Sequence, residues 1–166
     1  MSREDFYKTQ LNKNIKNRNS KILVLGAGKL DKKVFEELQY KNFYLSNIES
    51  STENDLNFFN NLHDLKLENE SYDYCVAHAC IHHSSKPHNA ILELYRVSSK
   101  GVLIIEANDS MISRLACKFG FSEEYEISAI KKNITYGGVD NSNIPNYVYR
   151  WTEREIIKLI KSFEPK

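Results

Sequence analysis

The residues best suited to proton transfer lie in one short run, His78-Ala79-Cys80-Ile81-His82-His83. Histidine has an ordinary pKa near neutral pH, so it often serves as a general base for hydroxyl or amine substrates. We therefore take His82 and His83 as candidate catalytic bases; alternatively, both pack or cap the following loop. The His/Cys spacing matches no known zinc pattern, and alternation along a strand would put only His78, Cys80 and His82 on one face. The sequence thus predicts no metal site.

A glycine-containing turn is the second candidate site. The apolar run at 21–25 ends in Gly26-Ala27-Gly28. Such a turn lets a ligand approach the backbone closely, and the N-terminus of the next helix offers unpaired N–H groups. Strand–glycine–helix turns also arise from packing, so the turn alone is ambiguous. Glu49 follows about 20 residues later, at the end of the next predicted strand, where a carboxylate can bind ribose hydroxyls. An exposed strand-end glutamate is the alternative.

Alternating strands and helices would position these residues. Apolar runs predict strands at 21–25, 43–48, 72–79 and 101–105, with an ambiguous short strand near 56–59. Helical periodicity predicts a helix capped by Asp31 and another with Pro87 in its first turn. This alternation predicts βαβ units and a mostly parallel sheet.

The alternation ends at Asp109. A helix at 111–119, a loop-rich region and a final helix with a Thr152/Glu155 capping box are expected beyond it. In the loop-rich region, four aromatic residues could form an acceptor pocket or simply pack the loops onto the core. They are Tyr136, Tyr147, Tyr149 and Trp151.

Composition limits the partners and the compartment. A length of 166 residues fits one domain core, and a formal net charge of +1 gives no reason to expect nucleic acid or a membrane surface as partner. The N-terminal residues lack an apolar signal segment, and no run approaches the about 20 apolar residues that span a bilayer. Three cysteines in such a chain favour reduced thiols and a cytoplasmic location. We expect Cys75 and Cys117 to be buried, inert thiols.

Several segments follow one another in an order typical of one enzyme family. They are Ile22–Gly28, the strand ending at Glu49, Leu65–Asp73, Tyr74–His83, Ala90–Val97 and Gly101–Glu106. In this order they resemble the signature blocks of Rossmann-like (class I) S-adenosylmethionine-dependent methyltransferases, most closely the small-molecule type. The resemblance covers roughly residues 21–108.

The resemblance implies S-adenosylmethionine as cofactor and assigns roles by position. Gly26, Ala27 and Gly28 would line its methionine and ribose part, and Glu49 would bind the ribose hydroxyls. The enzyme would methylate a small-molecule or saccharide-type acceptor.

The remaining cofactor contacts follow from the same resemblance. Asn61 stands where the family usually has an aspartate that touches the adenine amino group, and Leu62 would offer its backbone N–H to the ring. His78 would lie at the end of the fourth strand, where the methionine moiety and the acceptor meet. Glu106 and Asn108 would face the same cleft, because ligands bind at the carboxyl ends of parallel strands.

The expected architecture is α/β, a Rossmann-like three-layer sandwich without the family's usual C-terminal antiparallel strand pair. The chain divides into a polar, partly frayed leader (1–20), an S-adenosylmethionine-binding core (21–108) and an acceptor-side or lid region with a terminal helix (109–166). An uncovered sheet edge tends to associate, so we expect either a homo-oligomer formed through that edge or marginal stability.

Departures from the family pattern leave a second reading open. Val24 replaces the acidic residue usually found two positions before the first glycine, and Leu30 replaces the third glycine of the loop. The alternative is a catalytically silent methyltransferase-like module for binding or assembly. A nicotinamide-dependent oxidoreductase is disfavoured because the later blocks match methyltransferases and the chain has no Tyr-x-x-x-Lys pair.

Overall fold

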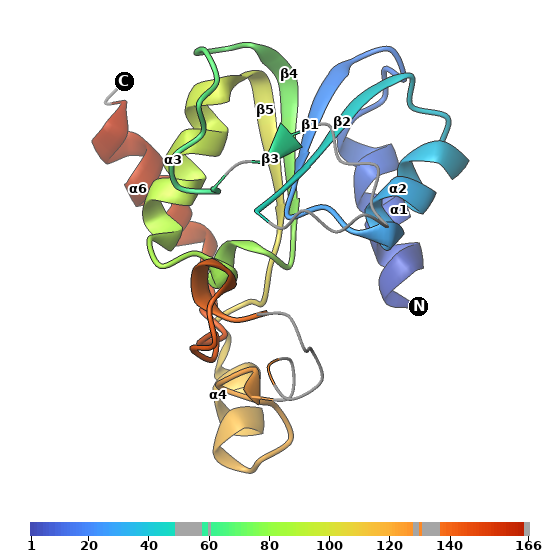
Figure 1. Cartoon of the computed structure of the whole chain (residues 1–166). Coiled ribbons are helices and arrows are strands. Elements are labelled where there is room, and N and C mark those ends of the chain that lie inside the picture. The colour runs from blue at the N-terminus through green and yellow to red at the C-terminus, as the bar shows by residue number, and fades with distance from the viewer. Residues whose placement is uncertain (49–57, 60, 128–129, 131–136, 165–166) are drawn as a thin grey trace.

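The computed structural model describes residues 1–48, 58–59, 61–127, 130 and 137–164. These residues contain a parallel sheet of five strands in the order β3-β2-β1-β4-β5 (Figure 1). The strands are β1 (Lys21–Leu25), β2 (Asn42–Asn47), β3 (Phe58–Phe59), β4 (Tyr72–His78) and β5 (Ser98–Ile105). The predicted α/β class and parallel sheet are confirmed.

The central strand β1 shows why the sequence forms this sheet. It pairs with β2 on one side and β4 on the other. Ile22 and Val24 pack into the core on one face, while Leu23 and Leu25 pack into the core on the other. A strand buried on both faces needs an unbroken apolar run, which Ile22–Leu25 supplies.

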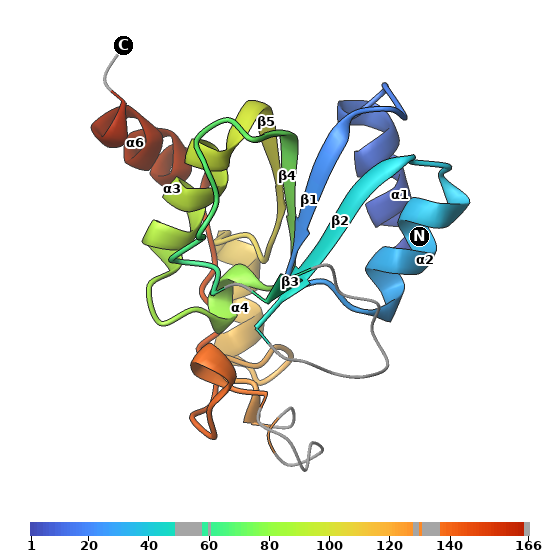
Figure 2. The same ribbon diagram turned by 45° about the horizontal axis from the view of Figure 1, so that its top comes forward.

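Helices cover both faces of the sheet (Figures 1 and 2). On one side lie α1 (Arg3–Asn14) and α2 (Lys29–Glu37), and on the other α3 (Pro87–Val97) and α6 (Glu153–Phe163). The result is the predicted three-layer sandwich. Helix α4 (Met111–Lys118) lies below the sheet in Figure 1. The structure also contains two short 3-10 turns, η1 (Ile81–His83) and η2 (Val139–Asn141).

The expected frayed leader is wrong, because residues 3–14 form helix α1. Ser2 caps the helix in a reciprocal capping box with Asp5. Tyr7 and Leu11, one helical turn apart, are fully buried against the sheet. Only these two residues of the helix are buried, and the polar residues around them leave a weak amphipathic signal, which is why sequence reasoning missed the helix. The division of the chain at residues 20 and 108 stays a prediction.

The family-like segment Ala90–Val97 has a structural role. Both carboxylate oxygens of Glu93 lie 2.8 Å from guanidinium nitrogens of Arg96, and the Glu93 carboxylate also accepts the backbone N–H of Leu65. Arg96 then donates to the backbone carbonyls of Leu65 and Leu67. This pair fastens the segment before β4 onto α3, so the motif organises the fold and not the chemistry.

The edges of the sheet concern the prediction that copies of the chain associate. Every strand pair among the described residues is parallel, with β3 and β5 at the edges. The expected association through an open edge stays a prediction. Within the described residues, no helix is long and apolar enough to cross a membrane.

Candidate active site

The glycine turn joins β1 to α2 at the carboxyl edge of the sheet. Gly26 has a left-handed backbone (φ 60°), and a Cβ placed there would lie 2.3 Å from the Cβ of Cys80. No side chain fits at that distance. Gly26 is therefore required by the close approach of the turn that follows β4, so packing alone accounts for this glycine.

The other two turn residues are held by hydrogen bonds. The Ala27 N–H donates to the Ser46 carbonyl at 3.0 Å, and the Gly28 N–H donates to the Asp31 carboxylate at 2.9 Å. Gly28 is the N-cap of α2. Asp31 was predicted to be the cap and instead lies at the third helical position, from which its carboxylate reaches back to Gly28. Burial raises the pKa of Asp31 despite that hydrogen bond.

Gly28 differs from Gly26 in the space around it. Among the described residues, only an Asp31 oxygen lies near a Cβ built at Gly28, at 4.0 Å, and the Gly28 φ of −130° suits any residue. Neither sterics nor backbone conformation explains a glycine here. Close approach of a ligand to the backbone, at a helix N-terminus, is consistent with it.

His78 ends β4 and is covered by the N-terminal helix. The Tyr7 ring lies 4.2 Å from the His78 ring, and the Arg3 Nε donates to His78 Nε2 at 3.2 Å. Burial, followed by the nearby Arg3 charge, lowers the pKa of His78. The imidazole is therefore neutral at neutral pH and accepts the Arg3 hydrogen bond.

The predicted adenine contacts lie after β3. The Asn61 side-chain oxygen accepts the backbone N–H of His63 at 3.3 Å, and Leu62 packs against the core beneath α3. The predicted ribose ligand Glu49 lies outside the described residues, as does Tyr136.

Glu106 was expected to face the cleft, and this is wrong. Its side chain is only 3% exposed. One carboxylate oxygen accepts the backbone N–H groups of Cys80 and Ile81, both at 2.7 Å, and the other lies 2.8 Å from His82 Nδ1. Glu106 thus fixes the 3-10 turn η1 to the end of β5 and orients the His82 ring.

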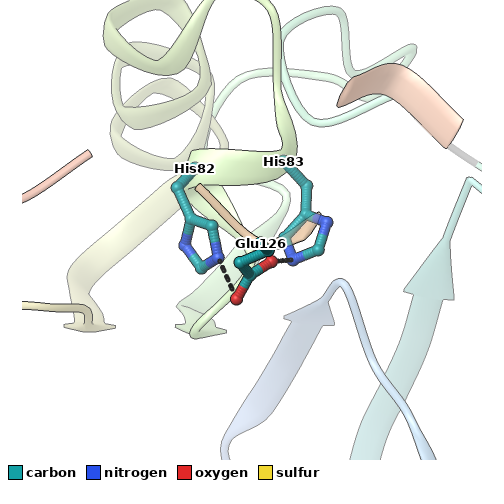
Figure 3. A group of neighbouring side chains, drawn as sticks. All are labelled: His82, His83 and Glu126. Atoms are coloured by element: carbon teal, nitrogen blue, oxygen red, sulfur yellow. Dashed lines mark ion pairs between the residues drawn. The ribbon is translucent and has the colours of Figure 1, made fainter. Parts of the chain in front are cut away.

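The two candidate bases converge on a carboxylate that the sequence did not single out. His82 Nε2 and His83 Nε2 each lie 3.5 Å from an oxygen of Glu126, as Figure 3 shows. Burial lowers the pKa of His82, but the Glu106 hydrogen bond and the Glu106 and Glu126 charges outweigh it and raise the pKa overall. Burial and the His82 charge lower the pKa of His83.

Two loop segments hold Glu126 over the histidines. The Glu126 N–H donates to the Asn146 carbonyl at 2.9 Å, and Tyr125 forms an antiparallel bridge with Tyr147. The buried Asn146 amide contacts His83 Nδ1 at 2.8 Å and donates to the Gly137 carbonyl at 3.0 Å. Glu126 follows the histidines by more than forty positions in an unpatterned region, so no spacing rule could have found it.

The aromatic residues past Glu126 form a continuous stack on the α3 side. Tyr147, Tyr149 and Trp151 contact one another in order, and His88 lies against Trp151 with ring centroids 5.1 Å apart. A neighbouring cavity of about 340 Å³ is lined by Tyr147, Tyr149 and charged residues such as Arg114.

Two cysteines were predicted to be buried and inert. Cys75 is buried, and burial raises its pKa to about 12. Cys117 is only partly buried and lines this cavity, so its predicted full burial is wrong.

Comparison with known proteins agrees with this architecture. Residues 44–105 match the family model described as a methyltransferase domain. No curated protein sequence matches the chain.

Three solved structures share the fold. A protein of Pyrococcus horikoshii OT3 has a TM-score of 0.64 at 14% identity, with 96% of this chain and 79% of that chain covered. A candidate methyltransferase of Bacillus halodurans C-125 has a TM-score of 0.60 at 12% identity, with 93% and 63% covered. An S-adenosylmethionine-dependent methyltransferase of Thermotoga maritima has a TM-score of 0.54 at 17% identity, with 95% and 69% covered.

Residues 44–105 are therefore similar to a methyltransferase domain, and the chain has the Rossmann-like fold of class I methyltransferases. The resemblance inferred from the motifs is confirmed. The chain spans less than two thirds of the length of the Bacillus protein, so the activity of a whole protein is a matter for proposal.

Proposed function

We propose that the chain is an S-adenosylmethionine-dependent methyltransferase that acts on a small-molecule or saccharide-type acceptor. The observation that carries this is the position of the glycine turn. The turn follows β1, which lies between β2 and β4. In the order β3-β2-β1-β4-β5, the chain builds the sheet outward from β1 to one side and then to the other, so the strand order reverses between β1 and β4. Ligands of open parallel sheets bind at this switch point, outside the carboxyl ends of the strands.

The residues at this edge fit the cofactor. Gly28 leaves space at the N-terminus of α2, where a Cβ would narrow the approach. We assign Gly26, Ala27 and Gly28 to the methionine and ribose side and Glu49 to the ribose hydroxyls. Asn61 and Leu62 are assigned to the adenine ring, and His78 to the methionine end. S-adenosylmethionine supplies an electrophilic methyl group on a sulfonium.

The chain's own residues would position the acceptor and take its proton. When an acceptor oxygen or nitrogen forms the new bond to carbon, the bond from carbon to sulfur breaks and the acceptor must release a proton. His82 Nε2 and His83 Nε2 lie at the same edge, because Cys80 packs on Gly26 and His82 follows two positions later. Glu106 holds His82 through Nδ1, an arrangement that orients a general base.

One observation favours the silent-module alternative. The Ala27 and Gly28 N–H groups already have partners within the protein. A cofactor bound at this turn would therefore receive fewer backbone hydrogen bonds than it would from a turn whose N–H groups have no partner in the protein.

Calorimetry with S-adenosylhomocysteine separates these readings. Glu49→Ala should weaken binding at least tenfold if Glu49 holds the ribose. Gly28→Ala should weaken it as well, by crowding the ligand, while lowering the free energy of unfolding by no more than about 1 kcal/mol, because alanine is a poorer N-cap than glycine. Wild-type affinity in both variants would remove the assigned cofactor site.

A further inference from the structure

Three groups that commonly bind metal ions meet at one point outside the glycine turn. One ligand atom each from His82, His83 and Glu126 lies within 4.8 Å of the others. Figure 3 shows both imidazole rings, which come from η1, directed at the Glu126 carboxylate. The fold thus assembles a set that no sequence spacing reveals.

The separations suit a bound ion better than direct hydrogen bonds. Each nitrogen-to-oxygen distance to Glu126 is 3.5 Å, longer than the 2.7–2.9 Å typical of a charge-assisted hydrogen bond. Two ligands about 2.1 Å from a tetrahedral ion are about 3.4 Å apart. Small side-chain shifts would bring the remaining pair, which lies within 4.8 Å, to the same spacing.

His82 supplies an independent indication. Its side chain is 6% exposed, and its Nε2 atom is buried with no hydrogen-bond partner among the residues that the structure describes. A buried polar atom left unsatisfied costs about 1–3 kcal/mol, so its persistence calls for a ligand. The other ring nitrogen is held by the Glu106 carboxylate at 2.8 Å. A carboxylate behind a metal-binding histidine is the usual supporting contact, since it fixes the tautomer and raises the basicity of the ligand.

The His83 ring is positioned by a loop residue. The Asn146 amide nitrogen lies 2.8 Å from His83 Nδ1, and His83 Nε2 lies 3.5 Å from Glu126. Metal binding through Nε2 needs the ring proton on Nδ1, so the Asn146 amide would turn its oxygen toward that nitrogen. His83 and Glu126 are partly exposed, at 36% and 30%, so the side of the cluster away from His82 is open.

We propose that His82, His83 and Glu126 bind one divalent transition-metal ion, with Zn²⁺ the first candidate, and leave a coordination position open. Two imidazoles and one carboxylate with an open position form the ligand set of a catalytic rather than a structural zinc site. Such a ligand set disfavours Mg²⁺, which prefers oxygen ligands.

The ion's role rests on the proposed function, whereas its binding does not. An acceptor hydroxyl in the open position would lose its proton at a lower pH, because a bound metal ion stabilises the oxyanion. His82 and His83 would then be ligands, and neither would act as a free base.

Calorimetric titration of untagged, chelator-treated protein with ZnCl₂, and visible absorption with CoCl₂, test the site. We expect one ion per chain and the cobalt bands typical of four- or five-coordinate sites. Glu126→Gln, at a partly exposed position, and His83→Ala should each lower Zn²⁺ affinity at least 100-fold. Glu106→Gln should lower it by about 10–100-fold, because it removes only the support of His82.

His88→Ala is the matched control. His88 Nε2 lies 3.3 Å from Glu155, so it is also a histidine–carboxylate pair, but the described part of the chain places no third metal-binding group beside it. This variant should bind Zn²⁺ like the wild type. Wild-type protein that binds neither Zn²⁺ nor Co²⁺ more tightly than Glu126→Gln would overturn the proposal.

S-adenosylhomocysteine binding, measured on the same samples, separates the two hypotheses. Zn²⁺ binding without S-adenosylhomocysteine binding would retain the metal site and reject the proposed function. The reverse would reject the metal site and leave His82 and His83 as candidate bases.

Discussion

Replacing Gly26 tests whether this glycine is demanded by packing. In Gly26→Ala the new Cβ would lie 2.3 Å from Cys80 Cβ and 2.7 Å from its Sγ, on a backbone with φ of 60°. The left-handed conformation costs a non-glycine residue about 1–2 kcal/mol. Overpacking typically costs about 1–3 kcal/mol. The free energy of unfolding should therefore fall by about 2–5 kcal/mol, measured by urea denaturation.

Two further variants separate these contributions. Gly120 also has a positive φ (75°), but no atom of the described residues lies within 4 Å of a Cβ built there, so Gly120→Ala should show only the backbone cost. Cys80→Gly removes the atoms that the new methyl group would strike. The double variant Gly26→Ala/Cys80→Gly should therefore be about 1–3 kcal/mol more stable than the sum of the single effects predicts. Strict additivity, or a Gly26→Ala cost no larger than that of Gly120→Ala, would refute the steric explanation.

Two other predictions address the helices. Leu11→Ala should destabilise the protein by about 2–5 kcal/mol in urea denaturation, because Leu11 is fully buried. The control Leu115→Ala, at a 45% exposed position, should cost under about 1 kcal/mol. Equal costs of the two substitutions would contradict the packing of α1 against the sheet. Glu93→Gln should destabilise the protein at pH 7, because the Arg96 hydrogen bond lowers the pKa of Glu93. A carboxylate with a lowered pKa in the folded state stabilises the fold at pH values above its ordinary pKa of about 4.3, and this stabilisation is lost as the pH falls through the folded-state pKa. The difference in free energy of unfolding between Glu93→Gln and wild type should therefore shrink below about pH 4. A difference that stays constant with pH would argue against the ion pair.

Most of the fold could be predicted because its signals are local. The apolar runs at β1, β4 and β5 mark a sheet buried on both faces, and Thr152 caps α6 as expected. Helix α1 escaped prediction because only Tyr7 and Leu11 anchor it to the sheet along a polar sequence. Its contacts with His78 are tertiary, so nothing within residues 1–20 indicates them.

The candidate site was only partly predictable. The glycine turn and the His82-His83 pair follow apolar strands, so their place at the sheet edge could be inferred. The exposure of Glu106 was mispredicted because a strand-end position fixes where a residue lies but not its hydrogen-bond partners. Glu126 and Asn146 come from loops whose path depends on long-range contacts, and their approach to His83 emerges only in three dimensions.

The central claim is that the glycine turn at the switch point of the sheet belongs to a working S-adenosylmethionine site. Isothermal calorimetry of the purified chain with S-adenosylhomocysteine, with NAD as the control ligand, tests it most directly. The account predicts micromolar binding of S-adenosylhomocysteine and none of NAD. Absence of binding to S-adenosylhomocysteine by a chain that is folded by circular dichroism would contradict the claim and favour a silent methyltransferase-like module.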